Sequence, residues 1–375
     1  MLKASPQRVK ETFLALARLN SPPRQERPVA DWLIRELLQL GFEVEEDRAG
    51  EAVNGNSGNV LARLGGTLPG CPALLFSAHM DTVQPTPGLE PLVEGEVIHT
   101  GGRSILGADD KAGIAAILEG IRLVLESGFP RPPVEVAFTV CEEVGLLGAL
   151  HLDPAWVKSP AAFILDGEGP VGSYIVQAPA QEEFKAEVYG RAAHAGVEPE
   201  KGVNAIQVAA EAIACLEWGR LGRETTANVG LIEGGQAVNI VPDRARVRGE
   251  VRSHDPAQLE AQVRRIRQSF LEAAARRGAE VEVQFRRSFT SFRLDPQTPA
   301  LQTLQAAARR IGLKIRPVVG GGGSDANVWN ERGVVAVNLG IGVKGEHTPQ
   351  ERASVEQLVR AAELVAALIL EWGRP

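Results

Sequence analysis

The chain of 375 residues has few of the features that mark disulfide-rich, zinc-knuckle or membrane proteins. Its three cysteines, Cys71, Cys141 and Cys215, are odd in number and widely spaced, which argues against a disulfide framework and against paired zinc-knuckle spacing. No apolar run approaches the roughly 18 residues that a membrane span requires. We therefore expect a protein of the reducing cytoplasm with no membrane partner.

An excess of positive charge is also absent, as is the apolar core of a signal peptide. The formal net charge is -7 at pH 7, and the basic cluster RRIRQ around Arg264 fits the solvated face of a helix. The opening stretch MLKASPQRVKETFLALARLN has the pattern of an amphipathic helix instead of a leader. These absences argue against a nucleic-acid partner and against secretion.

The composition is that of an ordinary globular protein, with 44% hydrophobic and 23% charged residues and enough length for two domains or one large domain with an insertion. Helical periodicities alternate with apolar strand-like runs, which predicts an α/β fold with a mostly parallel sheet sandwiched by helices. The expected helices are Pro6–Leu19, Glu26–Leu40, Asp109–Ser127 and Ser354–Trp372. The expected strands are NVLARL, PALLFSA, VEVAFTV, AAFIL and GVVAVNLGIG.

The pattern changes between about residues 180 and 291, where the strands alternate apolar and polar residues. Their order with two helices, Val203–Trp218 and Pro256–Arg277, is βαββαβ, which is the ferredoxin-like unit. We interpret residues 180–291 as a lid domain inserted into a catalytic domain formed by residues 1–179 and 292–375.

Histidines and acidic residues gather where the apolar runs end. His79 and Asp81 in SAHMDTVQP follow one strand, and side chains at i and i+2 of a strand point to the same face. Similar groups follow other strands or open the long helix: Asp109, Asp110, Glu142, Glu143, Asp166 and His347. Because ligands collect beyond the carboxyl ends of strands in open α/β sheets, we expect these groups to converge. Without a cation, such a cluster would be strongly repulsive.

The chemistry of this cluster suggests a pair of metal ions. One imidazole with carboxylates on each side, and one carboxylate shared, suits two zinc ions about 3.5–4 Å apart. Nitrogen and oxygen donors without thiolate favour zinc, with cobalt or manganese as substitutes. Asp81 can accept the remaining N–H of His79, and one of the adjacent glutamates is free to act as a general base.

The motifs HMD, GADDKAG, CEEVGLLGA, ILDGEG and GEHTPQE, in this order, resemble the dizinc exopeptidase superfamily of peptidase T, aminoacylase-1, carboxypeptidase G and succinyl-diaminopimelate desuccinylase. The longer strings LGADDKAG and AAHAGVEPEKG are most similar to the peptidase T-like tripeptide aminopeptidases. The resemblance extends over nearly the whole chain, including the inserted lid.

The resemblance implies roles for individual residues. His79 and Asp166 would hold one zinc, Glu143 and His347 the other, and Asp109 would bridge them, with a cis peptide after Asp109. Glu142 would be the general base. In the lid, His194 would stabilise the oxyanion, usually across a dimer interface, while Asn239 and Arg252 would grip the carboxylate of the substrate. The loop GGGGSDANVW, which contains Gly322 and Ser324, would line the same pocket with backbone N–H groups.

Each motif alone also fits a structural role, and their conjunction is what favours a metal centre. Acidic doublets such as Glu142–Glu143 usually lie solvated on helices, and Asp109 or Asp110 could cap a helix. The four glycines at 320–323 lack the ending of a phosphate-binding loop. We expect Lys111 and Cys141 to pack near the site without direct chemistry.

The reaction that these residues imply is hydrolysis of an amide bond in a small peptide. A tripeptide aminopeptidase is the leading hypothesis, because Arg252 would bind the C-terminal carboxylate and so measure the length of the substrate. The first alternative is an N-acyl amino acid deacylase or carboxypeptidase of the same architecture, and the second is a non-catalytic peptide-binding protein. A homodimer through the lid is expected if His194 acts in the neighbouring subunit. The sequence leaves open whether His194 acts in its own subunit or in the neighbouring one.

Overall fold

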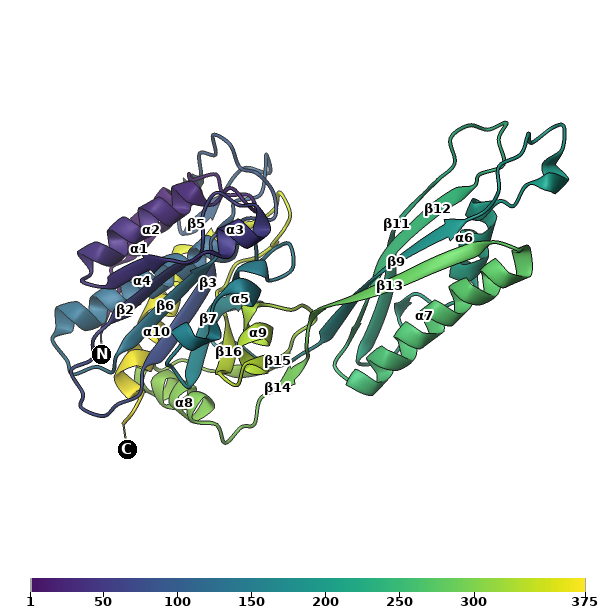
Figure 1. Cartoon of the computed structure of the whole chain (residues 1–375). Helices are drawn as coiled ribbons and strands as arrows, with labels where there is room; N and C mark the ends of the chain where they lie inside the picture. Colours follow the sequence, from purple (N-terminus) through teal and green to yellow (C-terminus); the bar gives the residue numbers. More distant parts are fainter. Residues whose placement is uncertain (1, 375) are drawn as a thin grey trace. The chain divides into compact units, whose positions relative to one another are not determined.

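The computed structural model describes residues 2–374 and divides the chain into two compact units (Figure 1). The second unit consists of Ala178–Phe292 and Gly321–Gly323. The first unit consists of the chain up to Gln177, of Arg293–Gly320 and of the chain from Ser324 onward. Each unit has a sheet and helices of its own, so each is described by itself.

The first unit is built around a nine-stranded sheet with the order β1-β2-β6-β3-β7-β16-β8-β14, in which β15 also pairs with β8. The neighbours β6, β3, β7 and β16 run parallel, as the sequence predicted, whereas β1, β2 and the pairing of β16 with β8 are antiparallel. Its strands are β1 (Glu43–Glu46), β2 (Val60–Leu64), β3 (Leu74–His79), β6 (Val134–Thr139), β7 (Ala161–Gly167), β8 (Ser173–Ala178), β14 (Phe292–Arg293), β15 (Arg316–Val319) and β16 (Val335–Gly340).

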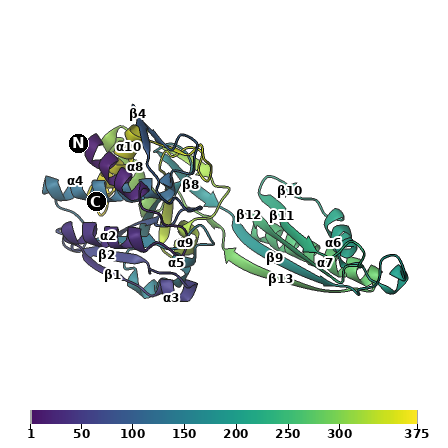
Figure 2. The ribbon, with the colours of Figure 1, turned by 90° about the horizontal axis from the view of Figure 1, so that it is seen from above.

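Helices surround this sheet. They are α1 (Pro6–Ala17), α2 (Arg27–Gln39), α3 (Ala49–Val53), α4 (Ala108–Ser127), α5 (Leu147–His151), α8 (Pro299–Ile311), α9 (Asp325–Glu331) and α10 (Val355–Glu371), with a 3-10 turn at Pro154–Trp156. Helix α10 packs on α1, α4 and α8, and Figure 2 shows α4, α8 and α10 grouped together. Helix α9 packs on β7 and β16, and α2 packs on β1 and β2. The central strands are buried along their whole length, which explains their near-continuous apolar sequences.

A small three-stranded sheet accompanies the first unit. It consists of β4 (Leu92–Glu94), β5 (Val97–His99) and β17 (Arg352–Ser354), with β5 in the middle and both pairings antiparallel. The sequence did not predict these short strands. Strand β17 follows the loop that contains His347, so this small sheet anchors one end of that loop.

The second unit is an antiparallel sheet with two helices on one face, and it confirms the βαββαβ order. The strands are β9 (Ala180–Tyr189), β10 (Gly219–Arg220), β11 (Thr225–Gly234), β12 (Arg244–Ser253) and β13 (Glu280–Phe289), in the order β10-β11-β12-β9-β13. The helices are α6 (Ala205–Ala214) and α7 (Pro256–Arg277), and a 3-10 turn lies at Pro199–Lys201. Short β10 is an addition to the predicted order.

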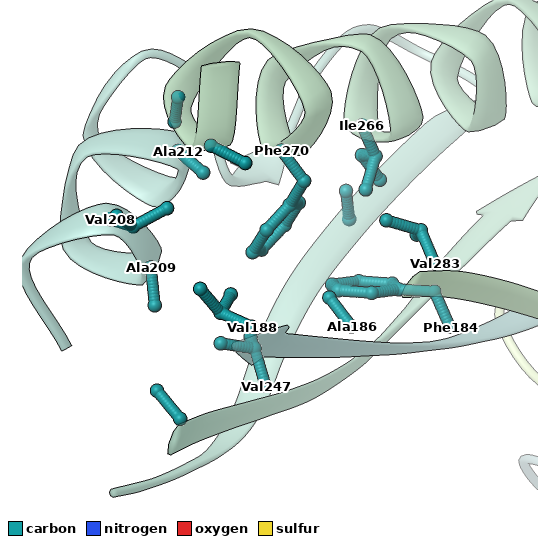
Figure 3. Close-up of a cluster of buried hydrophobic side chains, with 14 of the residues drawn as sticks. Phe184, Ala186, Val188, Val208, Ala209, Ala212, Val247, Ile266, Phe270 and Val283 are labelled. Atoms are coloured by element: carbon teal, nitrogen blue, oxygen red, sulfur yellow. The ribbon is translucent and has the colours of Figure 1, made fainter. Parts of the chain in front are cut away.

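The core of the second unit lies between the helices and the inner face of the sheet (Figure 3). Phe184 on β9 contacts the rings of Phe270 on α7 and Phe285 on β13 at centroid distances of 6.4 and 6.0 Å. The alternate residues of β9 point to the opposite, polar face, which is why the strand alternates apolar and polar residues.

Helix α4 differs from the prediction at its start. Asp109 and Asp110 have non-helical backbone angles, and the peptide bond between them is cis, as the resemblance predicted. These two residues therefore form a turn in front of the regular helix and do not belong to its first turn. Within residues 2–374, no helix is both long enough and apolar enough to cross a membrane.

Candidate metal centre

The metal-binding side chains predicted from the sequence meet at one edge of the first unit. His79 is the last residue of β3, Glu142 and Glu143 follow β6, and Asp166 lies near the end of β7. Because β6, β3 and β7 are parallel neighbours, their carboxyl ends lie at the same edge of the sheet. The turn that contains Asp109 and the loop that contains His347 reach this edge from elsewhere in the chain.

Two groups of side chains have the spacing of metal ligands, and Asp109 belongs to both. The first is His79, Asp109 and Asp166, the second is Asp109, Glu143 and His347, and the ligand atoms within each group lie within 4.8 Å of one another. The two oxygens of Asp109 face different imidazoles. Oδ1 is 3.2 Å from Nε2 of His79, and Oδ2 is 3.1 Å from Nε2 of His347. This is the arrangement of a bridging carboxylate.

The contacts within the groups also fit a pair of cations. Two ligands bound about 2.0–2.1 Å from one tetrahedral zinc ion lie about 3.3 Å apart. Nε2 of His347 lies 3.1 Å from Oε1 of Glu143, and Nε2 of His79 lies 3.9 Å from Oδ1 of Asp166. Oε1 of Glu143 is buried and makes no hydrogen bond, as expected for an atom that would bind a cation.

The electrostatics of the centre favour a positive charge among its carboxylates. Burial, followed by the nearby charge of Asp166, raises the pKa of Glu142 well above its ordinary value. Burial and then the charge of Asp109 raise the pKa of Asp166 in the same way. Burial also opposes ionisation of Asp109, but hydrogen bonds with His347 and His79 outweigh it and lower the pKa. Closely spaced carboxylates of this kind are stabilised when a cation lies between them.

The ring of His79 is held in the tautomer that a metal ligand needs. Its Nδ1 lies 2.9 Å from the backbone carbonyl oxygen of Asp81, which can only accept, so Nδ1 carries the proton. Nε2, which faces Asp109 and Asp166, is then the ring nitrogen that would bind a cation. The sequence suggested that the carboxylate of Asp81 accepts this N–H, but Oδ1 of Asp81 lies farther from Nδ1, at 3.5 Å.

The carboxylate of Asp81 instead supports the loop after β6. Its Oδ1 accepts the backbone N–H of Glu142 at 2.9 Å, and its Oδ2 accepts that of Glu143 at 3.1 Å. Asp81 is fully buried, so these bonds are shielded from water. One aspartate therefore fixes the peptides of the candidate base and of a candidate metal ligand.

Two further buried acids around this loop were missed by the sequence analysis. Oε1 of Glu26, at the start of α2, accepts the backbone N–H of Cys141 at 3.0 Å and lies 3.3 Å from its thiol sulfur. Asp325, at the start of α9, accepts the hydroxyl proton of Thr139 at 2.6 Å. Asp325 lies within the glycine-rich motif, but nothing in the sequence around Glu26 indicates its contact with residue 141, which is far away in the chain.

Lys111 and Cys141 occupy buried positions beside the centre. The ammonium group of Lys111 donates to the carbonyl of Leu19 at 2.6 Å, and burial lowers its pKa to about 7. Burial, followed by the charge of Glu26, raises the pKa of the Cys141 thiol far above its usual range. A thiol in that state is a poor nucleophile.

The residues predicted to bind substrate in the lid lie on the second unit. His194 is exposed in the loop after β9 and pairs with Ile240 in an isolated bridge, and the backbone carbonyl of Asn239 accepts the N–H of Ala195 at 3.0 Å. His194 and Asn239 are therefore neighbours. Arg252 on β12 donates to Glu250 through Nε at 3.0 Å and through Nη2 at 3.1 Å.

The glycine-rich loop is divided between the units. A side-chain carbon placed on Gly322 would lie 4.0 Å from Nη1 of Arg252, so the open backbone of Gly322 faces the guanidinium group. Ser324, in the first unit, caps α9 by accepting the N–H of Ala326, and its hydroxyl also accepts from Asn338 at 2.9 Å. The Ser324 side chain is thus engaged within the fold, and its role toward substrate stays a prediction.

Comparison with known proteins agrees with this geometry. The family model described as Peptidase family M20/M25/M40 matches residues 75–371. The chain is 40% identical to the uncharacterized protein YqjE of Bacillus subtilis over 98% of this chain and 99% of that protein.

Two solved structures are similar along the whole chain. The aminopeptidase PepT of Bacillus cereus is 37% identical with a TM-score of 0.90, covering 99% of this chain and 100% of that one. A tripeptidase of Staphylococcus aureus is 34% identical with a TM-score of 0.93, covering 98% of both chains.

Proposed function

This chain belongs to the peptidase family M20/M25/M40, and from this premise we propose that it is a dizinc aminopeptidase that removes the N-terminal residue of tripeptides. The observation that carries the proposal is the position of Asp109 between His79 and His347, with a terminal carboxylate beside each imidazole. The aminopeptidase and the tripeptidase that resemble this chain over nearly its full length support the choice of substrate.

The donor set supports zinc. His79 and Asp166 would hold one ion, Glu143 and His347 the other, and Asp109 both. Mixed imidazole and carboxylate donors without thiolate suit zinc, and cobalt or manganese can substitute. When bound, the two ions would polarise the scissile carbonyl and make water more acidic.

Glu142 is the general base of the proposed reaction. It lies next to the ligand Glu143 but in neither ligand group, so its carboxylate is free for proton transfer. Burial raises its pKa above the ordinary value of a glutamate, which makes the carboxylate a stronger base. One Oε of Glu142 takes the proton of the attacking water and then gives it to the leaving amine.

The lid would supply recognition of the substrate. The guanidinium of Arg252 would bind the C-terminal carboxylate, with Asn239 as a second donor, and His194 would donate to the oxyanion. Glu250 supports this assignment of Arg252, because it already holds the guanidinium through two parallel hydrogen bonds. The Arg252 side chain is 30% exposed, and its Nη1 takes part in neither bond to Glu250.

The lid would also form a homodimer in the reducing cytoplasm. Several aliphatic side chains of the second unit are exposed, with Val197 at 74% and Val238 at 103% of full exposure. Leu231, Ile232 and Ile240 add to this apolar set, which a second copy of the chain would cover. The three free cysteines suit a reducing compartment. Light scattering of the purified protein tests the dimer, and a monomer at micromolar concentration would contradict it.

The test of the proposed function combines metal analysis with a panel of substrates. We expect two zinc ions per chain and cleavage of free tripeptides, with slower cleavage of dipeptides and none of N-blocked peptides. Cleavage of only N-acetyl amino acids or blocked dipeptides would favour the deacylase or carboxypeptidase alternative. Tight binding of peptide without hydrolysis, with zinc or cobalt added, would favour a binding protein.

A further inference from the structure

Glu351 holds together two segments of the metal centre that are far apart in the sequence. We propose that Glu351 is a positioning residue, whose carboxylate ties the turn of Asp109 to the loop of His347 and so sets the spacing of the ligands of one metal ion. The inference rests on the two metal positions of the proposed function, and no role for Glu351 was predicted from the sequence.

The carboxylate of Glu351 accepts four consecutive backbone N–H groups. Oε2 accepts those of Leu106 and Gly107 at 2.7 and 2.9 Å. Oε1 accepts those of Ala108 and Asp109 at 2.8 and 3.0 Å. Glu351 is 1% exposed, so water does not compete for these bonds. They fix the main chain that enters the non-helical turn at Asp109.

The other end of Glu351 is part of the loop that carries His347. Lys344 and Arg352 exchange backbone hydrogen bonds of 3.1 and 2.9 Å, which close the base of this loop. Inside the loop, the N–H of Glu351 donates to the carbonyl of Thr348 at 3.0 Å, and the N–H of Thr348 donates to the carbonyl of Gly345 at 3.2 Å. His347 and Glu351 are therefore held on one short, internally bonded loop.

These contacts form a closed ring through Asp109. Its backbone N–H is bound by Glu351, and its carboxylate lies 3.1 Å from Nε2 of His347 on the same loop as Glu351. Two ligand residues that are already held in place by such a ring lose less conformational entropy when a cation binds to them. Loss of the Glu351 carboxylate would leave His347 and Asp109 connected through their side chains alone.

The chain offers a matched control in Glu135 on β6. Glu135 is 2% exposed and also accepts backbone N–H groups, from Lys158 at 3.1 Å and from Ser159 at 3.0 Å. It lies at the start of β6, at the opposite end of the strand from Glu142 and Glu143, and it belongs to neither ligand group. Glu135 also accepts the hydroxyl proton of Ser159 at 2.7 Å and pairs with Arg63 at 3.2 Å. A general cost of removing a buried carboxylate should therefore appear at Glu135 as well as at Glu351.

The test compares Glu351→Gln, Glu351→Asp and Glu135→Gln in the full-length protein. An amide offers one acceptor oxygen, so glutamine can satisfy one pair of N–H groups and places an NH2 group against the other pair. Each protein is stripped with a chelator and titrated with Zn²⁺ against a competing chelator, and its unfolding temperature is recorded with and without Zn²⁺. These readouts do not depend on the substrate.

We expect Glu351→Gln to weaken binding of one of two zinc ions by about 10- to 100-fold, as is usual for groups that orient metal ligands. Glu351→Asp should fall between Glu351→Gln and the native protein, because the shorter side chain retains the charge. Glu135→Gln should lower the unfolding temperature of the metal-free protein and leave both zinc affinities within about twofold. In the active enzyme, Glu351→Gln should lower kcat more than it changes KM.

Native zinc affinity in Glu351→Gln would overturn the proposal, as would equal losses of affinity in Glu351→Gln and Glu135→Gln. If Glu351→Gln does not fold, the affinity of Glu351→Asp decides, and a native value there overturns the proposal. A native protein that binds two zinc ions but cleaves no tripeptide would contradict the proposed function. A selective loss of zinc in Glu351→Gln would support the positioning role even then.

Discussion

Asp81, which follows strand β3, accepts the backbone N–H of Glu142 at 2.9 Å. Glu142 is the candidate base and follows the neighbouring strand β6, so Asp81 links the ends of two central strands. The other oxygen of Asp81 accepts the N–H of Glu143 at 3.1 Å. Asp81 itself is fully buried. The candidate base and the candidate ligand beside it are thus positioned through their main chain by one side chain.

Replacing Asp81 with asparagine tests this support. The amide keeps the shape but has one acceptor, so one of the two N–H groups loses its partner, at a cost of about 1.5–3 kcal/mol for a bond to a charged group. If that cost appears in the transition state, kcat falls about 10- to 100-fold. The measurement is kcat and KM with zinc content determined in parallel. Unchanged kcat at full zinc content would contradict the role.

Glu142 and Glu143 are adjacent, but substitutions at the two positions should have different effects on activity and zinc content. Glu142→Gln should lower kcat by at least about 100-fold while zinc content stays near two per chain, because general bases contribute about 100- to 10,000-fold. Glu143→Gln should lose one zinc ion, since Glu143 belongs to a ligand group. Metal analysis and kcat on a tripeptide separate the two outcomes. Full activity in Glu142→Gln would refute its assignment as the base.

The parts of the fold and site that could be predicted are those that depend on local pattern and on one topological rule. Three of the predicted apolar runs are the parallel neighbours β3, β6 and β7. They lead to His79, to Glu142 and to Asp166, respectively. Because their carboxyl ends share an edge, the convergence of these groups followed from their place in the sequence. The alternation in the lid likewise indicated a sheet with one polar face.

The parts that could not be predicted depend on hydrogen bonds between side chains and distant main chain. Glu351 and Glu26 bind N–H groups of residues about 240 and 115 positions away, and such partners leave no periodicity in a sequence. The tautomer of His79 depends on a carbonyl oxygen, which every residue has. Ser324 lay in a predicted binding loop, yet its hydroxyl is engaged in capping α9.

Arg252 gives a prediction about the substrate. If its guanidinium binds the C-terminal carboxylate, the native enzyme should prefer a free tripeptide to the same tripeptide with a C-terminal amide. Arg252→Lys should lose about 10- to 100-fold in kcat/KM on the free acid, because lysine cannot make the two-pronged contact. Its activity on the amide should change little.

The matched control for Arg252 is Arg248→Lys. Arg248 lies four residues earlier on β12, and so on the same face of the strand. This variant should keep the native preference for the free acid. Equal losses on the acid and on the amide in Arg252→Lys would contradict recognition of the carboxylate.

A charge cluster on the lid predicts how stability depends on pH. Glu187 on β9 contacts Lys185, Arg244 and Arg246 at 2.6, 2.7 and 3.1 Å. The hydrogen bond from Lys185, with others from Tyr189 and Arg244, holds the pKa of Glu187 below its ordinary value of 4.5. Its stabilising contribution is therefore present above about pH 4.5 and is lost as the pH falls through the lower pKa of the folded protein.

Glu187→Gln should therefore be less stable than the native protein at pH 7, and the difference should shrink toward pH 3. Urea unfolding followed by circular dichroism at the two pH values measures it. Glu282→Gln is the control, because Glu282 lies opposite Glu187 in the sheet register but is exposed and makes none of these ion pairs. A difference between native protein and Glu187→Gln that stays constant from pH 7 to pH 3 would contradict the assignment.

Mixing two inactive variants tests whether His194 acts in the neighbouring subunit. Glu142→Gln lacks the base but keeps His194, and His194→Ala lacks the imidazole but keeps the base. If His194 acts across a dimer, a mixed dimer contains one site with both groups intact and one with neither. Equal mixing with free exchange then makes half of the dimers mixed, which restores about a quarter of native activity. Action within one subunit restores none, because every site in the mixture then lacks one group.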